Sequence, residues 1–409
     1  MQERSTASSL ASRSHVQADA RRPLLVCFSH LRWDFVWQRP QQLLSRAARD
    51  YRVIFVEDPL LAPCDEAHLD LSYGPGAVTV AVPVLPERFR PAERIGTCRA
   101  LIDDLLTSMG APVSVTWFYT PMALETFEDV DSEVCVYDCM DELSAFRGAP
   151  RELRHYETAL FEKADIVFTG GRSLYEAKYG RHPNVHCFPS SIDVSHFRQA
   201  RKPVGAEPAD QAPIGRPRLG FFGVVDERMD TALLAEMADL RPDWQFVMLG
   251  PVVKINASDL PRRPNIHWLG PKRYEELPSY LSRWDIGFMP FALNEATRYI
   301  SPTKTPEFLA AGLPVVSTPI TDVVRTYGDS GFVEIAGTAQ EAVAKAANLL
   351  NRSRTQWLGR VDRLLSTMSW DLTWQKMNEE IDRMRGRSIS SRMRIRQTSD
   401  LGAGEVSRV

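Results

Sequence analysis

Short apolar runs alternate with amphipathic helical patterns from residue 24 onward, and this alternation limits the fold more than any other feature of the sequence. Apolar runs that are bounded by turn residues and separated by helices are typical of parallel strands covered by helices. In the first half of the chain the pattern predicts strands at 24–28, 52–56, 77–82, 113–118, 133–138, 165–170 and 185–189. It predicts helices at 40–50, 93–109 and 150–163.

Residues 198–217 interrupt this pattern with four prolines, two glycines and no sustained periodicity, which is typical of a linker. The alternation then restarts, with strands predicted at 218–225, 244–250, 265–270, 285–290, 314–318 and 331–335. Helices are expected after a cap near Asp230, around 274–283, before Gly312, and at 338–350, 353–366 and 371–385. The sequence therefore predicts an α/β protein of two Rossmann-like domains, whose ligands bind at the carboxyl ends of parallel strands.

The predicted domain limits follow from these breaks in the pattern. The chain divides into a disordered leader (1–21), a first domain (22–195), a linker (196–217), a second domain (218–370), a helix expected to pack back toward the first domain (371–385) and a disordered tail (386–409). Both terminal segments are polar and lack hydrophobic periodicity, which is typical of disorder. The basic run SSRMRIR in the tail leaves contact with an anionic membrane open, although a solvated tail is the simpler interpretation.

Composition argues against several classes of protein. A net charge of −3 over 409 residues, with no recognisable nucleic-acid-binding motif, argues against a nucleic-acid partner. The six cysteines have no CxxC spacing and several lie in apolar runs, which predicts buried thiols in a reducing compartment. No apolar run reaches the ~18 residues that span a bilayer, and the N-terminus lacks the apolar core of a secretory signal. We therefore expect a cytoplasmic protein, with peripheral membrane contact near Trp33 and Trp37 left open.

The segment SPTKTPEFLAAGLPVVST, residues 301–318, carries the clearest chemical signal. Thr305, Pro306 and Glu307 form a good helix start, because threonine caps, proline fits the first turn and an acid favours the positive helix end. An earlier start at Ser301 would put Pro306 inside the helix, so we expect the later one, with Lys304 in the preceding loop. The exposed N–H groups near this start then form an anion site suited to a diphosphate.

Two side chains of this segment suit a nucleotide ligand. Lys304 adds a positive charge beside the predicted anion site, and the carboxylate of Glu307 can accept two hydrogen bonds from a vicinal diol such as that of ribose. The alternative interpretation is an ordinary capped helix with a surface lysine, and spacing alone does not decide between the two.

The segment resembles the donor-binding region of glycosyltransferase family 4, in which a glutamate precedes small residues and then Gly-x-Pro-Val-Val; Glu307 occupies that place. The upstream run FALNEATRYISPTK resembles the branch of that family that makes teichuronic acid and exopolysaccharides. The resemblance is specific over residues 285–320. It implies a GT-B fold, retention of anomeric configuration, no bound metal, and a place around the diphosphate and sugar for Asn294, Ser301, Thr303 and Lys304.

The chain departs from the family pattern at two places. The pattern has two glutamates separated by seven residues, and the first would fall on Tyr299, so Glu295 is the substitute that the resemblance leaves. Many members also carry an arginine and a lysine after the first strand of the second domain, where this chain has Arg228 and no following lysine. Lys304 or Lys272 would then replace that charge. The resemblance thus assigns Glu307, Ser301, Thr303, Asn294, Glu295, Lys272 and Gly223 to donor binding, with Lys304 and Arg228 assigned to catalysis.

Polar side chains in the first domain follow two predicted strands at their carboxyl ends. The run SHLRWDFVWQRPQ follows the first strand, and YDCMDEL ends another. The acids of the second run could contact substrate, hold a metal or cap a helix, and the resembled family needs no metal. We expect this wall to bind the acceptor through Arg32, Trp33, Arg39, Asp138 and Asp141, with His30 and Asp34 as candidate catalytic groups.

The predicted function is transfer of a sugar from a nucleoside-diphosphate-sugar co-substrate to a hydroxyl of a saccharide or lipid-linked acceptor, in cell-surface polysaccharide or glycoconjugate biosynthesis. No separate cofactor is expected. A nicotinamide- or flavin-dependent oxidoreductase is disfavoured, because neither first strand is followed by G-x-G-x-x-G. A non-catalytic protein that binds a nucleotide sugar or assists assembly on the same fold stays open as the alternative.

Overall fold

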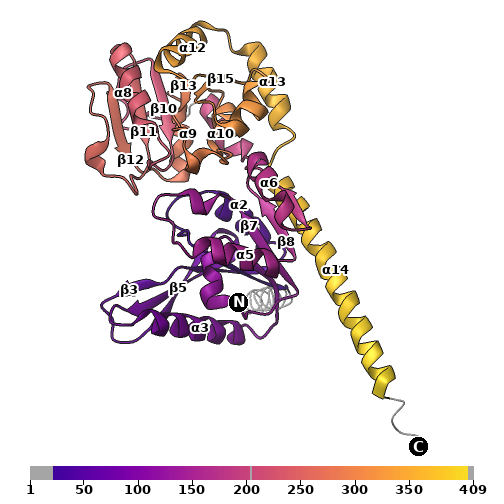
Figure 1. The fold of residues 1–409 in the computed structure, drawn as a ribbon. Helices are drawn as coiled ribbons and strands as arrows, with labels where there is room; N and C mark the ends of the chain where they lie inside the picture. Colours follow the sequence, from indigo (N-terminus) through magenta and orange to yellow (C-terminus); the bar gives the residue numbers. More distant parts are fainter. Residues whose placement is uncertain (1–21, 203–204, 404–409) are drawn as a thin grey trace, which may run out of the picture.

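The computed structural model describes residues 22–202 and 205–403, which form two α/β domains joined by a linker and by a long C-terminal helix (Figure 1). This architecture confirms the predicted pair of Rossmann-like domains. Among the described residues, no helix combines the length and the apolar character needed to cross a bilayer. The expected leader, 1–21, lies outside the described residues, as does the stretch 404–409.

The first domain is built on a nine-stranded sheet in the order β3-β5-β2-β1-β6-β7-β8-β9, with β4 on the outer side of β5. All neighbours pair in parallel except β4 and β5. The strands are β1 (Leu24–Ser29), β2 (Arg52–Glu57), β3 (Leu60–Ala62), β4 (His68–Gly74), β5 (Val78–Pro86), β6 (Val113–Phe118), β7 (Val134–Cys139), β8 (Ile166–Thr169) and β9 (Val185–Cys187). The sequence did not predict β3 and β4, because both are exposed edge strands without a buried apolar run.

Helices cover this sheet on both faces. They are α2 (Arg39–Ala47), α3 (Pro91–Ser108), α4 (Leu124–Phe127), α5 (Leu153–Lys163) and α6 (Arg172–Lys178). Proline lies in the first turn of α2 and of α3, where its missing N–H leaves no helical bond unmade. One face buries Leu43, Trp117 and Phe168, and the other buries Phe28 and Ile102.

The second domain contains a six-stranded, all-parallel sheet in the order β12-β11-β10-β13-β14-β15. The strands are β10 (Arg218–Phe222), β11 (Gln245–Leu249), β12 (Ile266–Gly270), β13 (Ile286–Met289), β14 (Val315–Ser317) and β15 (Val333–Ile335). The helices are α8 (Thr231–Leu240), α9 (Leu277–Leu281), α10 (Lys304–Ala310), α11 (Thr321–Val323), α12 (Ala339–Asn351) and α13 (Thr355–Leu365). The predicted cap of α8 is confirmed, since the Leu233 amide donates to Asp230 Oδ1 over 2.8 Å.

The predicted linker is ordered and packed over much of its length. Helix α7 (Val194–Arg198) opens it, and Phe197, Ala200 and Ile214 are buried in the core of the second domain. Trp284 Nε1 donates to Gln211 Oε1 over 2.7 Å, which fixes the irregular stretch before β10. The composition of this stretch limits regular structure to short helices at its start and is compatible with burial.

Helix α14 (Trp370–Ala403) returns to the first domain and runs past it (Figure 1). Its side chains Trp374, Met377 and Ile381 complete the core that contains Trp117, and Trp374 Nε1 donates to Asp50 Oδ2 over 2.8 Å. The expectation of a disordered tail from 386 is wrong as far as residue 403. A helix already nucleated by packing extends at low cost, because each further residue adds one hydrogen bond without a new nucleus.

Substitution of the tryptophan that docks α14 should destabilise the first domain. Trp374→Ala empties a buried site and is expected to lower the free energy of unfolding by about 3–5 kcal/mol. Urea denaturation measures the change, with Lys376→Ala on the exposed side of the same helix as control. Equal stability of the two variants would show that α14 does not belong to this core.

Candidate active site

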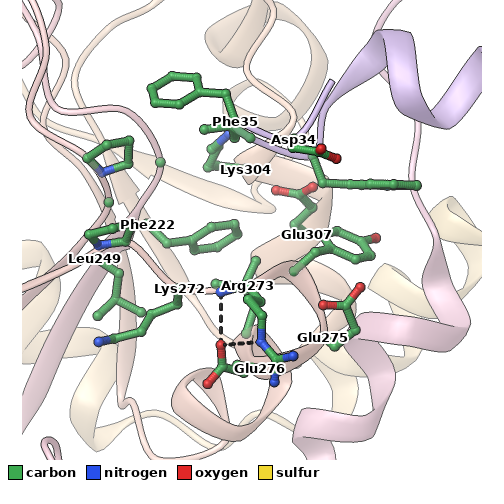
Figure 2. Close-up of a pocket in the computed structure, with 18 of the residues that line it drawn as sticks. Asp34, Phe35, Phe222, Leu249, Lys272, Arg273, Glu275, Glu276, Lys304 and Glu307 are labelled. Carbon is green, nitrogen blue, oxygen red and sulfur yellow. Dashed lines mark hydrogen bonds and ion pairs between the residues drawn. The ribbon is translucent and has the colours of Figure 1, made fainter. Parts of the chain in front are cut away.

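A cavity of about 600 Å³ lies between the two domains. The loop between β1 and α2 forms one wall, and loops after β10, β11 and β12, together with α10, form the other. Figure 2 shows Asp34 and Phe35 of the first domain close to Lys304 and Glu307, with Arg273 and Glu276 on the opposite side of the cavity. The walls thus come from the carboxyl ends of strands in both domains, as parallel sheets of this kind predict.

Helix α10 begins at Lys304, with Thr303 as its N-cap, which is two residues earlier than predicted. The prediction assumed that Pro306 inside a helix would lose a hydrogen bond. The first N–H groups of a helix have no helical partner in any case, so proline in the first turn costs little. Lys304 and Glu307 are therefore three residues apart on one helix and lie on the same face.

Glu307 is a buried carboxylate whose hydrogen bonds are incomplete. Its side chain is 8% exposed, and Oε2 has no hydrogen-bond partner among the described residues. Burial raises the pKa of Glu307 to about 7, and the positive charge of Lys304 opposes this rise. A buried acceptor without a donor destabilises the protein, so such a group is typical of a ligand site.

Lys304 lies beside Glu307 with its ammonium directed along the cavity wall. Nζ donates to Thr303 Oγ1 over 3.2 Å and lies 5.7 Å above the ring of Phe222. Burial lowers the pKa of Lys304, while the Glu307 carboxylate opposes that shift. Gly223, with φ of 135°, makes room for this side chain, because a Cβ there would lie 2.8 Å from Lys304 Cε.

A second cavity of about 100 Å³ adjoins the first and shares Gly223 and Lys304 with it. Arg228 lines it and is held by its own domain, since its guanidinium donates to both carboxylate oxygens of buried Asp226 at 2.7–3.1 Å. Asp141 faces it from the first domain. Burial raises the pKa of the Asp141 carboxyl, and the charge of Arg228 opposes this most strongly. Ser301 and Thr303 complete the lining.

Arg39 and Asp138 have a different role from the predicted contact with the acceptor. They form a buried ion pair, 3% and 0% exposed, whose Nη2 and Oδ1 lie 2.8 Å apart, and Arg39 Nη1 also donates to the Phe188 carbonyl over 2.7 Å. Although Arg39 borders the second cavity, its donors are taken up within the first domain. A charge in this position had to be neutralised locally, because burying it unpaired is costly.

Other residues of the β1–α2 loop divide between site and core. Asp34 is exposed and lines the larger cavity, whereas Trp33 is 3% exposed and packs in the core against Phe55. Arg32 Nη1 pairs with Glu57 Oε2 at 2.8 Å, so it braces the end of β2. Burial, followed by the charge of Lys254, lowers the pKa of His30 to about 4. Trp33 and Arg32 therefore support the loop that presents Asp34. Nδ1 of His30 is buried and has no hydrogen-bond partner among the described residues.

The structure does not bring Asn294 and Glu295 to Glu307. Asn294 caps the short helix Glu295–Thr297, and its Nδ2 donates to the Glu227 carbonyl over 3.0 Å. Glu295 lines a separate hollow together with Tyr299, so it does not substitute for the missing family glutamate. The position of Glu295 depends on the path of the loop before α10, and the sequence pattern does not predict that path.

Lys272 lines the larger cavity, but Nζ pairs with Asp210 at 2.8 Å. Contributors to the site that were not predicted include Trp37, Tyr274 and Asp226. Asp226 lies two residues before Arg228, and this spacing of an acid and an arginine was the signal available in the sequence. Nothing in the sequence indicated that Trp37 and Tyr274 meet across the domains, with ring centroids 5.8 Å apart.

Comparisons with solved structures define the fold as GT-B. A trehalose-6-phosphate enzyme of E. coli, solved with UDP-2-fluoro glucose, aligns with a TM-score of 0.62 over 87% of this chain and 98% of that one, at 13% identity. Sucrose-phosphate synthase of Thermosynechococcus elongatus aligns with a TM-score of 0.64 over 90% of this chain and 100% of that one, at 14% identity. At these identities the likeness establishes the fold.

Sequence comparisons show similarity to glycosyltransferases over part of the chain. Residues 216–352 match the family model described as glycosyl transferases group 1. A Bacillus subtilis (strain 168) protein named as a teichuronic acid biosynthesis glycosyltransferase, TuaH, is 39% identical over 202 residues, covering 45% of this chain and 50% of that protein. The match to the family model thus lies within the second domain. The resemblance to the teichuronic-acid branch is confirmed, and the match spans half the length of that relative.

Replacing Glu307 by its neutral isostere should stabilise the protein at high pH. The raised pKa means that ionised Glu307 destabilises the fold; this penalty is absent below about 4.5, grows toward pH 7 and is complete above it. A shift from 4.5 to about 7 corresponds to roughly 3 kcal/mol at full ionisation. Glu307→Gln should therefore gain about 2–3 kcal/mol more at pH 8 than at pH 5 in urea denaturation.

The exposed Glu128→Gln serves as control for this experiment. An equal effect of Glu307→Gln at both pH values would contradict the raised pKa and, with it, the burial of an ionisable carboxyl at the site.

Proposed function

We propose that this chain is a glycosyltransferase that moves a sugar from a nucleoside-diphosphate-sugar to a hydroxyl of a saccharide or lipid-linked acceptor. The observation that carries the proposal is the buried carboxylate of Glu307, with Oε2 unpartnered among the described residues, on the same helical face as Lys304 and at a cavity between two domains. Both residues lie within the stretch that matches the family model. The TuaH relative supports a role in cell-surface polysaccharide or glycoconjugate biosynthesis.

We propose one orientation for the donor in this site. The ribose diol donates to Glu307, and the diphosphate extends toward Lys304 and Arg228, with the hydroxyls of Ser301 and Thr303 beside it. Both cations are in position before the substrate binds. Arg228 is held by its ion pair with Asp226, and the Lys304 side chain lies against Gly223, where a larger residue would exclude it. Charge placed in advance in a partly water-excluded site stabilises the leaving diphosphate without further reorganisation.

The acceptor approaches from the first domain, where Asp34 and Asp141 face the two cavities. The bond between the sugar carbon and the diphosphate oxygen breaks, the acceptor oxygen bonds to that carbon on the face that the diphosphate leaves, and the acceptor proton passes to the leaving diphosphate. This route retains configuration and needs no protein base. We propose that it also needs no metal ion, with Lys304 and Arg228 supplying the positive charge.

A second candidate function is binding of a nucleotide sugar without transfer. It is favoured by Tyr299, which stands where the family has its first glutamate, and by Glu295, which lies at a separate hollow. Turnover separates the two functions. Slow hydrolysis of the donor in the absence of acceptor supports the transferase, whereas tight binding with neither hydrolysis nor transfer supports the second candidate.

A thermal-shift screen against UDP-, GDP-, ADP- and dTDP-sugars tests the proposal directly. A ligand that binds only the folded protein raises its midpoint in proportion to the logarithm of its concentration over Kd. At least one of these nucleotide sugars should stabilise the chain. No stabilisation by any of them would overturn the proposed function.

Removal of either charged group of α10 should weaken donor binding. Glu307→Ala and Lys304→Ala are each expected to lose roughly 10- to 100-fold in donor affinity, since each removes a hydrogen bond or contact to a charged group. Calorimetric titration with the nucleotide sugar found in the screen measures this, and circular dichroism checks the fold. Glu128→Ala and Lys376→Ala, both exposed and outside the cavity, serve as matched controls. Unchanged affinity in both site variants would show that the donor binds elsewhere.

A further inference from the structure

Tyr274 connects the donor-site cavity to helix α7 and to the first domain. It opens the short helix Tyr274–Glu276 after β12 and lines the same cavity as Glu307. Its ring stacks on His196 of α7, with centroids 4.0 Å apart and planes at 9°. His196 Nε2 and the Tyr274 carbonyl oxygen are 3.0 Å apart, so this nitrogen carries a proton and donates to the carbonyl. The position of the Tyr274 ring is therefore fixed from one side by the linker.

The phenolic oxygen of Tyr274 accepts a hydrogen bond from the first domain. Gln42 Nε2 lies 3.2 Å from it, and Gln42 Oε1 accepts from Arg46 Nη1 over 2.9 Å. Because arginine only donates, this second bond fixes which end of the Gln42 amide faces the phenol. Tyr274 thus uses its oxygen as the acceptor toward Gln42 and keeps its own proton to donate. None of the residues in the described ranges accepts that proton.

Glu307 presents the complementary group. Its Oε2 is a buried acceptor with no donor among residues 22–202 and 205–403. Burial, and after it the negative charge of Glu307, raises the pKa of Tyr274, so the phenol remains protonated. Both side chains line the same cavity. The cavity therefore contains a free hydroxyl donor and a free carboxylate acceptor in the same neighbourhood.

We propose that Tyr274 is a specificity-determining residue of the donor site, donating its phenolic proton to one of the two ribose hydroxyls whose protons Glu307 accepts. The inference rests on the proposed function and adds the requirement for an intact ribose diol. A ligand hydroxyl is both donor and acceptor, so it satisfies Tyr274 and Glu307 together. A nucleotide without that hydroxyl leaves Tyr274 without an acceptor and Glu307 with one hydrogen bond fewer, and a site built to bond a hydroxyl discriminates strongly against its absence.

Calorimetric titration of the full chain with UDP, GDP and ADP, each in its ribose, 2′-deoxy and 3′-deoxy form, tests this inference. The wild type is expected to bind the ribose form at least 10-fold more tightly than one of the deoxy forms. Tyr274→Phe keeps the ring and its stacking, so it should weaken binding of the ribose form about 5- to 10-fold and leave binding of that deoxy form unchanged.

The control variant is Gln42→Leu, which removes the donor to the phenol oxygen and leaves the phenolic proton in place. It should preserve the preference for the ribose form. If Tyr274→Phe weakens all three forms equally, Tyr274 acts only on domain packing and the inference is overturned. The same holds if Tyr274→Phe changes nothing while Glu307→Gln still weakens binding. If none of the three diphosphates binds the wild type, the inference is overturned, whereas the proposed function fails only if no nucleotide sugar stabilises the chain in the thermal-shift screen.

Discussion

An ionisable carboxyl in a water-excluded place is costly unless something pairs with it, and the site of this protein is organised around that constraint. Glu307 is 8% exposed and keeps an unpartnered oxygen within the described structure, beside Lys304, which shares its helix. The ammonium offsets part of the penalty and is itself accommodated only because Gly223 has no side chain. A ligand that donates hydrogen bonds to the carboxylate removes the rest of this free-energy cost, and that gain contributes to the affinity for the ligand.

Contacts between the two domains hold the two walls of the site in position relative to each other. The Ser173 amide donates to Asp322 Oδ1 over 3.0 Å, and Arg325 pairs with Glu176 at 2.8 Å. On the side of the second cavity, the ring of Phe146 lies 5.3 Å from the guanidinium of Arg228 and 4.5 Å from Lys254 Nζ. Arg228, one of the two cations that we assign to the diphosphate, is therefore held by Asp226 of its own domain and by the ring of Phe146 of the other domain.

The sequence predicted the elements that are buried and periodic, and it failed where tertiary context decides. Strands β10 to β15 were all expected, because each is a short apolar run bounded by turn residues. The start of α10 was placed two residues late, since the rule against proline inside a helix does not apply in its first turn. The exposed strand β4 and the helical continuation of α14 lack the apolar pattern on which prediction relies.

Site residues divide in the same way. Glu307 and Lys304 were found from local pattern and resemblance, and the structure places both at the cavity. Arg39 and Asp138 were expected at the acceptor because both are charged residues near strand ends. Their mutual pairing joins positions 99 residues apart, which a single sequence does not reveal. The contacts of Tyr274 with Gln42 and His196 are hidden from the sequence for the same reason.

The return of α14 to the first domain makes the second domain an insertion within the first. The chain crosses between the domains twice, before α7 and before α14, and the two crossings lie side by side, since Arg198 and Arg201 pair with Asp362 of α13 at 3.1 and 2.8 Å. Two adjacent interdomain connections restrict sliding and twisting of the domains relative to each other more than a single linker does, and they favour rotation about the line through both connections.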